Sequence, residues 1–268
     1  ERKTMLQARK ISWINTVGLI TLIQREIRRF LNVYMQTVVA PLVTLLLYFI
    51  VFSIALGGGA AGREILGVQY MHFLAPGLLM MTMAQNAFSN SSSSLIIAKV
   101  QGNIVDILMP PLSSWEILVG MIVGAVFRGM LIGVIGALIL SLFVGVPVHN
   151  IGTIILFALM GNIMMASLGI VGGLWAEKFD HLATVTNFVI TPMTFLAGTF
   201  YALTALPPFW QKMALFNPIF YIIYGFRSGF IGVAEAPLLF GTLLMACFSV
   251  VLVAIAAILL KTGYKIKS

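Results

Sequence analysis

The sequence has very few charged side chains: Asp, Glu, Lys and Arg together make up 9% of its 268 residues, against about 25% in an average soluble domain. It also has almost no cysteine, because Cys247 stands alone, which excludes an intrachain disulfide and a cysteine-rich metal site. It contains no G-x-x-x-x-G-K-[ST] motif, the phosphate-binding loop of many ATPases. These absences argue against a soluble enzyme, a disulfide-stabilised secreted domain and an ATPase.

Apolar residues, by contrast, are abundant and make up 60% of the sequence. The hydrocarbon core of a bilayer is about 30 Å thick and a helix rises about 1.5 Å per residue, so about 20 apolar residues cross it. Six stretches meet this length: 33–56, 70–97, 116–145, 151–176, 183–203 and 236–261. We therefore expect an all-α membrane protein with six transmembrane helices in one domain over residues 1–268.

The placement of the positive charges predicts the orientation of these helices. Of the Lys and Arg residues, seven precede the first stretch, three follow the last and two lie in the second and fourth connections, whereas the other connections hold three. Because Lys and Arg are retained on the cytoplasmic side during insertion, we expect both termini in the cytoplasm. The basic clusters then serve topology and contact with anionic lipids rather than nucleic acid. The first apolar stretch is too long and too far into the chain for a cleavable signal peptide.

Residues 10–31 differ from the six stretches. Apolar side chains recur there at helical spacing, and charged side chains occupy another face of the same helix: Arg25, Glu26, Arg28 and Arg29. A helix with one apolar and one cationic face suits the headgroup layer of a membrane. We expect an interfacial amphipathic helix here; the alternative is a basic segment that only leads into the first span.

The second stretch ends in a group of polar side chains: Gln85, Asn86, Ser89, Asn90 and the serines at 91–94. Polar groups deep in lipid are costly, so they face other helices or water. They either join helices through interhelical hydrogen bonds or line a hydrated path near the cytoplasmic side. The sequence leaves both interpretations open.

The third stretch contains two pairs of glycines and one charge. Gly120 and Gly124, and then Gly129 and Gly133, are each four residues apart, a spacing that lets helix backbones approach closely. Arg128 lies about 12 residues, or roughly 18 Å, from the cytoplasmic end of this stretch. A charge at this depth costs at least about 2.5–3.5 kcal/mol. It must face a polar interior, a cluster of carbonyl groups or an acidic partner, and we expect a structural anchor rather than a cargo ligand.

Two connections carry further signals. The segment 98–112 is compact, with one or two helical turns over 103–108 that a Pro-Pro pair would end. We expect this helix to present Ile104, Ile107 and Leu108 outside the membrane, and exposed apolar side chains with few charges around them suit contact with a protein. The segment 206–231 is apolar, aromatic and interrupted by proline, so we expect short re-entrant helices in the outer leaflet, where Trp and Tyr prefer to lie.

Several of these features occur together in one known family. Arg-Glu-Ile-Arg-Arg-Phe (25–30) ends the interfacial helix, a proline lies in the first span, and Pro-Pro ends the segment that follows the second. Leu-Pro-Pro-Phe-Trp (206–210) is followed by Asn-Pro-x-x-Tyr-x-x-x-Gly-Phe-Arg (217–227). In this order, and over nearly the whole chain, the features resemble the type-2 ABC transporter permeases, above all their bacterial exporter-type members.

The resemblance implies a multi-pass subunit of the bacterial inner membrane that exports an amphiphilic, lipid-like or polysaccharide cargo by alternating access. It implies pairing with a second copy and with two cytoplasmic ATPase subunits. Those subunits would hold ATP and Mg, so this chain itself is expected to carry no cofactor, metal or catalytic residue. The segment 98–112 would be the cytoplasmic coupling segment.

The family's functional positions map onto three groups of residues. Contacts with the ATPase subunit would involve Arg25, Glu26, Arg28, Arg29, Lys99, Asn103, Ile104, Asp106 and Ile107. The transport pathway would involve Gln85, Asn86, Ser89, Asn90 and Phe195. The outer re-entrant motif would comprise Asn217, Pro218, Tyr221, Gly225 and Arg227.

Two other classes of membrane protein remain alternatives. An integral-membrane lipid-modifying enzyme needs acids, histidines or a nucleophile gathered at one interface, but His72, His149 and His181 are scattered along the chain. An ion-coupled carrier needs acidic side chains buried along its spans, and no Asp or Glu lies at mid-depth in the six stretches. The sequence therefore favours an exporter that is driven by ATP hydrolysis in another subunit.

Overall fold

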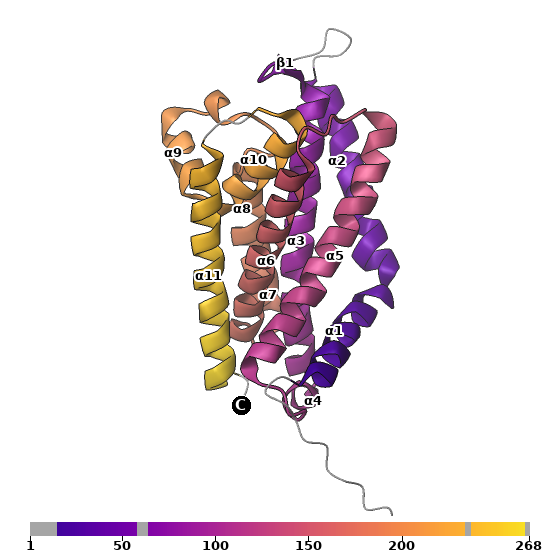
Figure 1. The fold of residues 1–268 in the computed structure, drawn as a ribbon, viewed down its shortest axis with the longest axis vertical. Coiled ribbons are helices and arrows are strands. Elements are labelled where there is room, and N and C mark those ends of the chain that lie inside the picture. The colour runs from indigo at the N-terminus through magenta and orange to yellow at the C-terminus, as the bar shows by residue number, and fades with distance from the viewer. Residues whose placement is uncertain (1–14, 58–63, 234–236, 266–268) are drawn as a thin grey trace, which may run out of the picture.

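Long helices that run side by side dominate the computed structural model, which describes residues 15–57, 64–233 and 237–265 (Figure 1). In chain order the long helices are α1 (Thr16–Leu31), α2 (Ala40–Leu56), α3 (Tyr70–Val100), α5 (Ser114–Phe143), α6 (Ile151–Trp175) and α11 (Leu238–Thr262). The π-helical turns are η1 (Met35–Val39) and η3 (Thr186–Ile190), and η4 (Leu203–Ala205) is a 3-10 turn. The shorter α-helices are α4 (Val105–Leu108), α7 (Phe179–Val185), α8 (Thr191–Leu196), α9 (Pro208–Phe216) and α10 (Pro218–Ile231).

Within the described residues, four helices are long and apolar enough to cross a membrane: Met35–Leu56, α5, α6 and α11. This agrees with the expected all-α membrane protein. The other two expected spans have a different character, because α3 carries the polar side chains of the second stretch and 183–203 is divided among α7, η3 and α8. Residues 10–14 of the expected interfacial helix and residue 236 of the expected last span lie outside the described ranges.

Both π-helical turns lie directly before a proline. Pro41 occupies the first turn of α2, which follows η1, and Pro192 occupies the first turn of α8, which follows η3. Proline lacks an N–H, and its ring collides with the carbonyl group four residues earlier. A wider turn ahead of the proline gives that carbonyl room, so the helical path continues through both prolines.

α3 lies at the centre of the bundle and packs against α2, α5, α6 and α10 (Figure 1). Its side chains are buried over most of its length, although it is less apolar than the helices that surround it. A helix that faces protein on nearly all sides does not need an apolar surface toward lipid. The central position therefore explains why so many polar residues of this chain lie on α3.

The bundle has two distinct ends. At one end lie α9, α10 and a small antiparallel hairpin of β1 (Glu64–Ile65) and β2 (Val68–Gln69), whereas α4 lies at the other (Figure 1). The hairpin was not expected from the sequence. Its two-residue loop, Leu66-Gly67, has positive φ at both positions, the geometry that matches the twist of a tight hairpin.

The glycine pairs of α5 bring neighbouring helices close to it. A Cβ atom on Gly120 would lie 2.7 Å from the side chain of Leu22, and one on Gly124 would lie 2.6 Å from Glu26. Helix α1 therefore packs directly against this part of α5, and the second glycine pair lets α6 and α3 approach just as closely. The predicted close approach of helix backbones is confirmed.

Candidate functional site

One side of α3 is lined with polar residues, because they are three or four positions apart. We call this set the polar stripe: Thr82, Gln85, Asn86, Ser89, Asn90 and Ser93. Ser91 lies outside the stripe and donates a hydrogen bond of 2.8 Å to the carbonyl of Ala166 in α6. Stripe residues also join helices, since Gln85 donates a hydrogen bond of 2.9 Å to the hydroxyl of Thr194 in α8. The interhelical hydrogen bonds expected from the sequence are therefore present, and part of the stripe borders a cavity as well.

The polar cavity lies between α3 and the η1–α2 helix and has a volume of about 310 Å³. Its walls are formed by Gln36, Ala40, Pro41, Thr44, Tyr48, Met81, Thr82, Gln85, Asn86 and Ser89. Three of the five pathway residues predicted from the resemblance therefore line one space. Asn90 lies one helical turn beyond it, and the ring of Phe195 lies 6.4 Å from that of Tyr48 in its wall.

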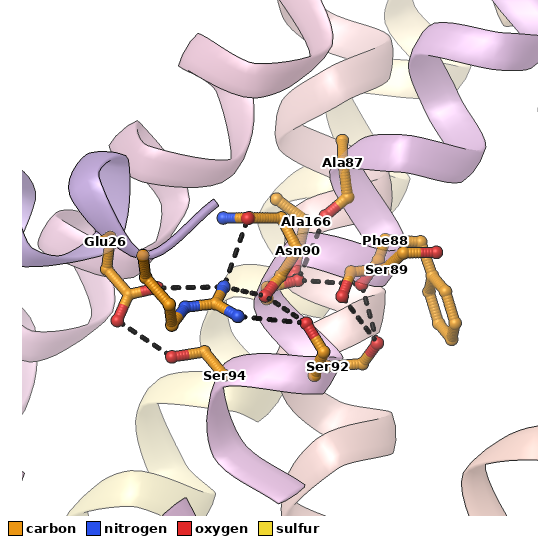
Figure 2. Close-up of polar contacts among 11 residues, drawn as sticks. Glu26, Ala87, Phe88, Ser89, Asn90, Ser92, Ser94 and Ala166 are labelled. Atoms are coloured by element: carbon orange, nitrogen blue, oxygen red, sulfur yellow. Dashed lines mark hydrogen bonds and ion pairs between the residues drawn. The ribbon is translucent and has the colours of Figure 1, made fainter. Parts of the chain in front are cut away.

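Beyond the polar cavity, α1 inserts an ion pair against the stripe (Figure 2). Glu26 is 1% exposed, and its carboxylate accepts a hydrogen bond of 2.8 Å from Ser94 and pairs with Arg29 at 3.3 Å. The guanidinium group of Arg29 donates to the backbone carbonyl and side-chain Oδ1 of Asn90, at 2.7 and 3.1 Å, and to Ser93 at 3.2 Å. A buried carboxylate is tolerated only when it is paired and hydrogen-bonded, and these contacts supply both.

Arg128 of α5 approaches the same stripe from another side. It is 7% exposed and donates a hydrogen bond of 2.7 Å to Oδ1 of Asn86. Of the three environments that the sequence allowed, it thus occupies a polar interior, and its hydrogen-bond partner is an amide. Arg29 and Arg128 thus hold asparagines one turn apart on α3.

A second cavity, the α1–α4 groove, lies at the end of the bundle that carries α4 and has a volume of about 430 Å³. It is lined by Asn15, Val17, Gly18, Thr21, Leu22, Arg25, Asp106, Ile107, Pro110, Pro111 and Leu112. Beside the groove, the carboxylate of Glu116 at the start of α5 accepts hydrogen bonds from the backbone N–H groups of Asn15 and Ser113. The start of α1 is thereby fixed to the start of α5.

The expectation that α4 presents Ile107 on its surface is wrong. The single helical turn folds back onto the bundle, so Ile107 is 3% exposed and packs in an apolar cluster with Leu22. Ile104 is half-buried beside the same cluster, Asp106 is exposed, and the side chain of Leu108 lies outside the described part of the structure.

The other predicted ATPase-contact residues differ in where their side chains lie. Arg25, Arg28 and Asn103 are exposed. Glu26 and Arg29 are directed into the bundle, as described above. Lys99 caps the end of α6, because its ammonium group donates hydrogen bonds of 2.7–3.3 Å to three backbone carbonyls, those of Gly173, Leu174 and Ala176. Their contact with an ATPase stays a prediction.

The motif of 217–227 fixes α10 between three other elements. Asn217 caps the helix by accepting from the N–H of Ile219, and it donates to the carbonyl of Met193 at 2.6 Å. Pro218 follows in the first turn, where a missing N–H costs nothing. Gly225 leaves room for the ring of Phe157 in α6, which a Cβ would strike.

Arg227 anchors the same helix to α3. Its guanidinium carbon lies 3.7 Å above the centre of the Phe73 ring, and Nη2 donates to the carbonyls of Gly198 and Thr199 at 2.8 and 3.2 Å. A planar guanidinium group makes both kinds of contact at once. Tyr221 adds a hydrogen bond from its hydroxyl to the carbonyl of Leu215, so the motif determines how α10 is seated.

Comparison with known proteins agrees with this arrangement. The family described as ABC-2 type transporter matches residues 18–231, which include α1, the polar stripe, α4, α5 and the whole of α10. The chain belongs to the ABC-2 type transporter family. It is 39% identical over 231 residues to the inner membrane transport permease YadH of Escherichia coli K12, covering 85% of this chain and 90% of that protein. It is 29% identical to nodulation protein J of Rhizobium leguminosarum bv. viciae, covering 68% and 70%.

Membership of the ABC-2 family makes the chain a transporter subunit rather than an enzyme. The described residues contain no group of three or more His, Cys, Asp or Glu side chains placed to hold a metal ion. The resemblance seen in the motifs is thus confirmed at the level of the family.

Sequence reasoning missed two contacts that shape the ends of this ABC-2 subunit. Ser113 and Glu116 form a capping box at the start of α5, and the spacing Ser-x-x-Glu was a signal that could have revealed it. Glu177 and Lys265 form an ion pair of 2.7 Å that ties the end of the described chain to the turn after α6. Their mutual hydrogen bond lowers the pKa of Glu177 and raises the pKa of Lys265.

Proposed function

We propose that this chain is the transmembrane subunit of a bacterial inner-membrane ABC exporter. Two copies would pair, and two cytoplasmic ATPase subunits holding ATP and Mg would bind them. The family match over 18–231 carries this proposal, together with the similarity to an inner membrane transport permease. The two alternatives, an ion-coupled carrier and a lipid-modifying enzyme, have no observation in their favour.

The proposed topology has six spans with both termini in the cytoplasm. α3 has 31 residues, about 46 Å of helix, and Phe179–Leu196 forms a helical path of about 27 Å. Both are long enough to cross most or all of a bilayer of about 30 Å. The lower apolar content of α3 follows from contacts with protein in place of lipid, whereas few side chains of Phe179–Leu196 are buried. The end that carries α4 would face the cytoplasm, and α9 and α10 would form the re-entrant segment in the outer leaflet.

The α1–α4 groove is the proposed docking surface for the ATPase subunit. Its rim offers a positive charge from Arg25 and a negative charge from Asp106, both exposed. A push on α1 would be transmitted in two directions, to α5 through the glycine contacts and to α3 through Glu26 and Arg29. Rigid helices packed in this way move as bodies, which supports an alternating-access cycle driven from the groove.

The proposed cargo is amphiphilic, lipid-like or polysaccharide. Support comes from a polar cavity set among apolar helices, since such a site offers hydrogen bonds to a headgroup beside apolar surface for a tail. The pathway would run along the polar stripe, where Gln85, Asn86 and Ser89 line the cavity.

The test begins with an affinity purification of the tagged chain from its native membrane in mild detergent, with mass spectrometry of its partners. We expect a P-loop ATPase at about one copy per permease. Recovery of the bare chain alone, both with and without ATP and vanadate, would contradict the proposal.

The docking surface is tested with the purified complex. Asp106→Lys should abolish stimulation of the ATPase by the permease, since it reverses the charge on the rim of the groove. Lys212→Glu, a charge reversal of equal size and opposite sign on exposed α9 at the other end of the bundle, is the control and should leave stimulation intact. Equal activity of the two variants would place docking elsewhere.

A further inference from the structure

The polar cavity lies beside an excess of positive charge that the proposed function leaves unexplained. Arg128 lies behind its wall, bonded to Asn86, and the ion pair of Glu26 and Arg29 lies one helical turn further along α3, bonded to Asn90. This part of the bundle thus holds two guanidinium groups and one carboxylate. The ion pair accounts for Glu26 and Arg29. Among the described residues, Arg128 has no carboxylate within ion-pair distance.

Hydrogen-bond donors also outnumber acceptors at this place. Within the described structure, four buried atoms of this group make no hydrogen bond, and three of them are donors: Nε of Arg29, Nδ2 of Asn90 and Nε of Arg128, beside Oε2 of Glu26. Oε2 is already in the ion pair with Arg29. Buried polar groups in proteins are normally paired, and an unneutralised charge in a membrane-spanning bundle is costly. The missing component is therefore an acceptor with negative charge.

The polar cavity is placed to supply that component. Asn86 lines the cavity and receives the hydrogen bond from Arg128, so the positive charge lies one amide group behind the wall. Gln36 and Thr44 on the opposite wall are exposed, which gives a ligand access from the surface. The residues that line the cavity include no acidic side chain that would repel an anion.

We infer that the polar cavity binds the anionic headgroup of an amphiphile, such as a phosphate or carboxylate, opposite Arg128. The inference deepens the proposed function and rests on it for the identification of the ligand as cargo. A cation is disfavoured by the excess positive charge. A neutral sugar headgroup would leave Arg128 without a counter-charge.

The experiment measures binding to the purified full chain by native mass spectrometry. Dodecyl phosphate serves as a free anionic amphiphile, dodecyl maltoside as its neutral counterpart, and phosphatidylglycerol as an anionic lipid. We expect dodecyl phosphate to bind more tightly than dodecyl maltoside. Arg128→Gln should weaken the anion about tenfold or more, because it removes a charge-assisted interaction, and should leave the neutral probe unchanged.

Two further variants keep the result interpretable. Arg128→Lys retains the charge and should retain most of the binding, and Lys212→Gln removes an exposed charge on α9 and should change nothing. If Arg128→Gln does not fold, Asn86→Asp is used, since a carboxylate at the atom that Arg128 already contacts neutralises its charge and should weaken the anion likewise. If Arg128→Gln loses affinity for dodecyl phosphate alone, the ligand is a free cargo. If it loses affinity for phosphatidylglycerol to the same extent, the ligand is a lipid headgroup.

Equal affinity for the charged and neutral probes, or an anion affinity unaffected by Arg128→Gln and by Asn86→Asp, would overturn the inference. Binding is measured without the ATPase, so this outcome is separate from a failure of the proposed function. A chain that binds no anion but still co-purifies with an ATPase would remain an exporter subunit whose cargo site lies elsewhere or is neutral.

Discussion

Replacement of Glu26 tests the link between α1 and α3. The structure buries its carboxylate almost completely and gives it one hydrogen bond, from Ser94, and one ion pair, with Arg29. Breaking a buried pair by removing one partner costs about 3–5 kcal/mol. In Glu26→Ala, Arg29 keeps its hydrogen bonds to Asn90 and Ser93 and is partly exposed. We therefore expect this variant to lose about 2–3 kcal/mol of free energy of unfolding, which is less than that range.

The assay is thermal unfolding of the detergent-purified chain, followed by tryptophan fluorescence. A loss of this size corresponds to a decrease in Tm of roughly 4–12 °C for a chain of this length. Arg28→Ala is the matched control, because Arg28 is an exposed charge on the same helix and should change stability by no more than about 0.5 kcal/mol.

A double-mutant cycle then isolates the contact between the helices. Glu26→Ala and Ser94→Ala should be non-additive, since each removes the same hydrogen bond. The reasoning is refuted if Glu26→Ala is no more destabilising than Arg28→Ala, or if the effects of Glu26→Ala and Ser94→Ala simply add. Either result would mean that α1 is held by its apolar contacts and that the hydrogen bond from Ser94 to Glu26 does not stabilise its packing on α3.

Three further predictions use the same preparation. Gly124→Leu should lower the stability by about 1–3 kcal/mol, because the new side chain collides with Glu26. Gly145→Ala is the control and should be neutral, because the added methyl group enters open space. Equal Tm values for the two variants would show that α1 does not pack on α5. Arg227→Lys should lower the Tm, since an ammonium group cannot stack on Phe73 and also make both hydrogen bonds, and a Tm equal to that of Lys212→Arg would contradict this. The pH dependence is measured in a variant with Trp175 as its only tryptophan and with His181, whose ring lies 5.7 Å from that of Trp175, replaced by Gln. Its fluorescence should stay constant near neutral pH and change as the pH falls through the lowered pKa of Glu177, below the ordinary 4.5, because the Lys265 pair is then lost. A Lys265→Gln variant should show no such transition.

The direction of that pH effect follows from the two pKa shifts. The lowered pKa of Glu177 means that the pair stabilises the folded chain above the ordinary pKa of a glutamate and is lost as acid protonates it. The raised pKa of Lys265 means that the same contact persists to the ordinary pKa of a lysine and is lost as the pH rises through the raised value. The contact is therefore complete across the neutral range.

Much of the fold was predictable, because length and apolar composition alone decide which segments form helices in a membrane. The expected stretches 116–145 and 151–176 correspond closely to α5 and α6. The predicted bounds of the fifth stretch, 183–203, were less accurate, since the helical path begins at Phe179 and ends at Leu196. Its end is set by a turn containing Gly198 at positive φ, and an apolar sequence gives little signal for such a turn.

The candidate site was predictable in its residue types but not in its partners. Polar side chains at 85–94 were recognisable, as was a charge at Arg128, because both are unusual in apolar stretches. The placement of Glu26 was not recognisable. It lies among three arginines on an amphipathic helix, and on sequence grounds all four belonged to one solvated face.

The sequence by itself determined that this chain is a helical membrane protein of the ABC-2 type, because apolar length, charge placement and the order of short motifs are all local properties. Only the tertiary structure decided what those residues do. In the folded chain, Glu26 and Arg29 point inward and Ile107 is buried. Arg128 of α5 contacts Asn86 of α3, although the two residues are 42 positions apart in the sequence. The physical reason is that an amphipathic pattern shows how polar a helix face is, whereas its neighbours decide whether that face meets water, lipid or another polar helix.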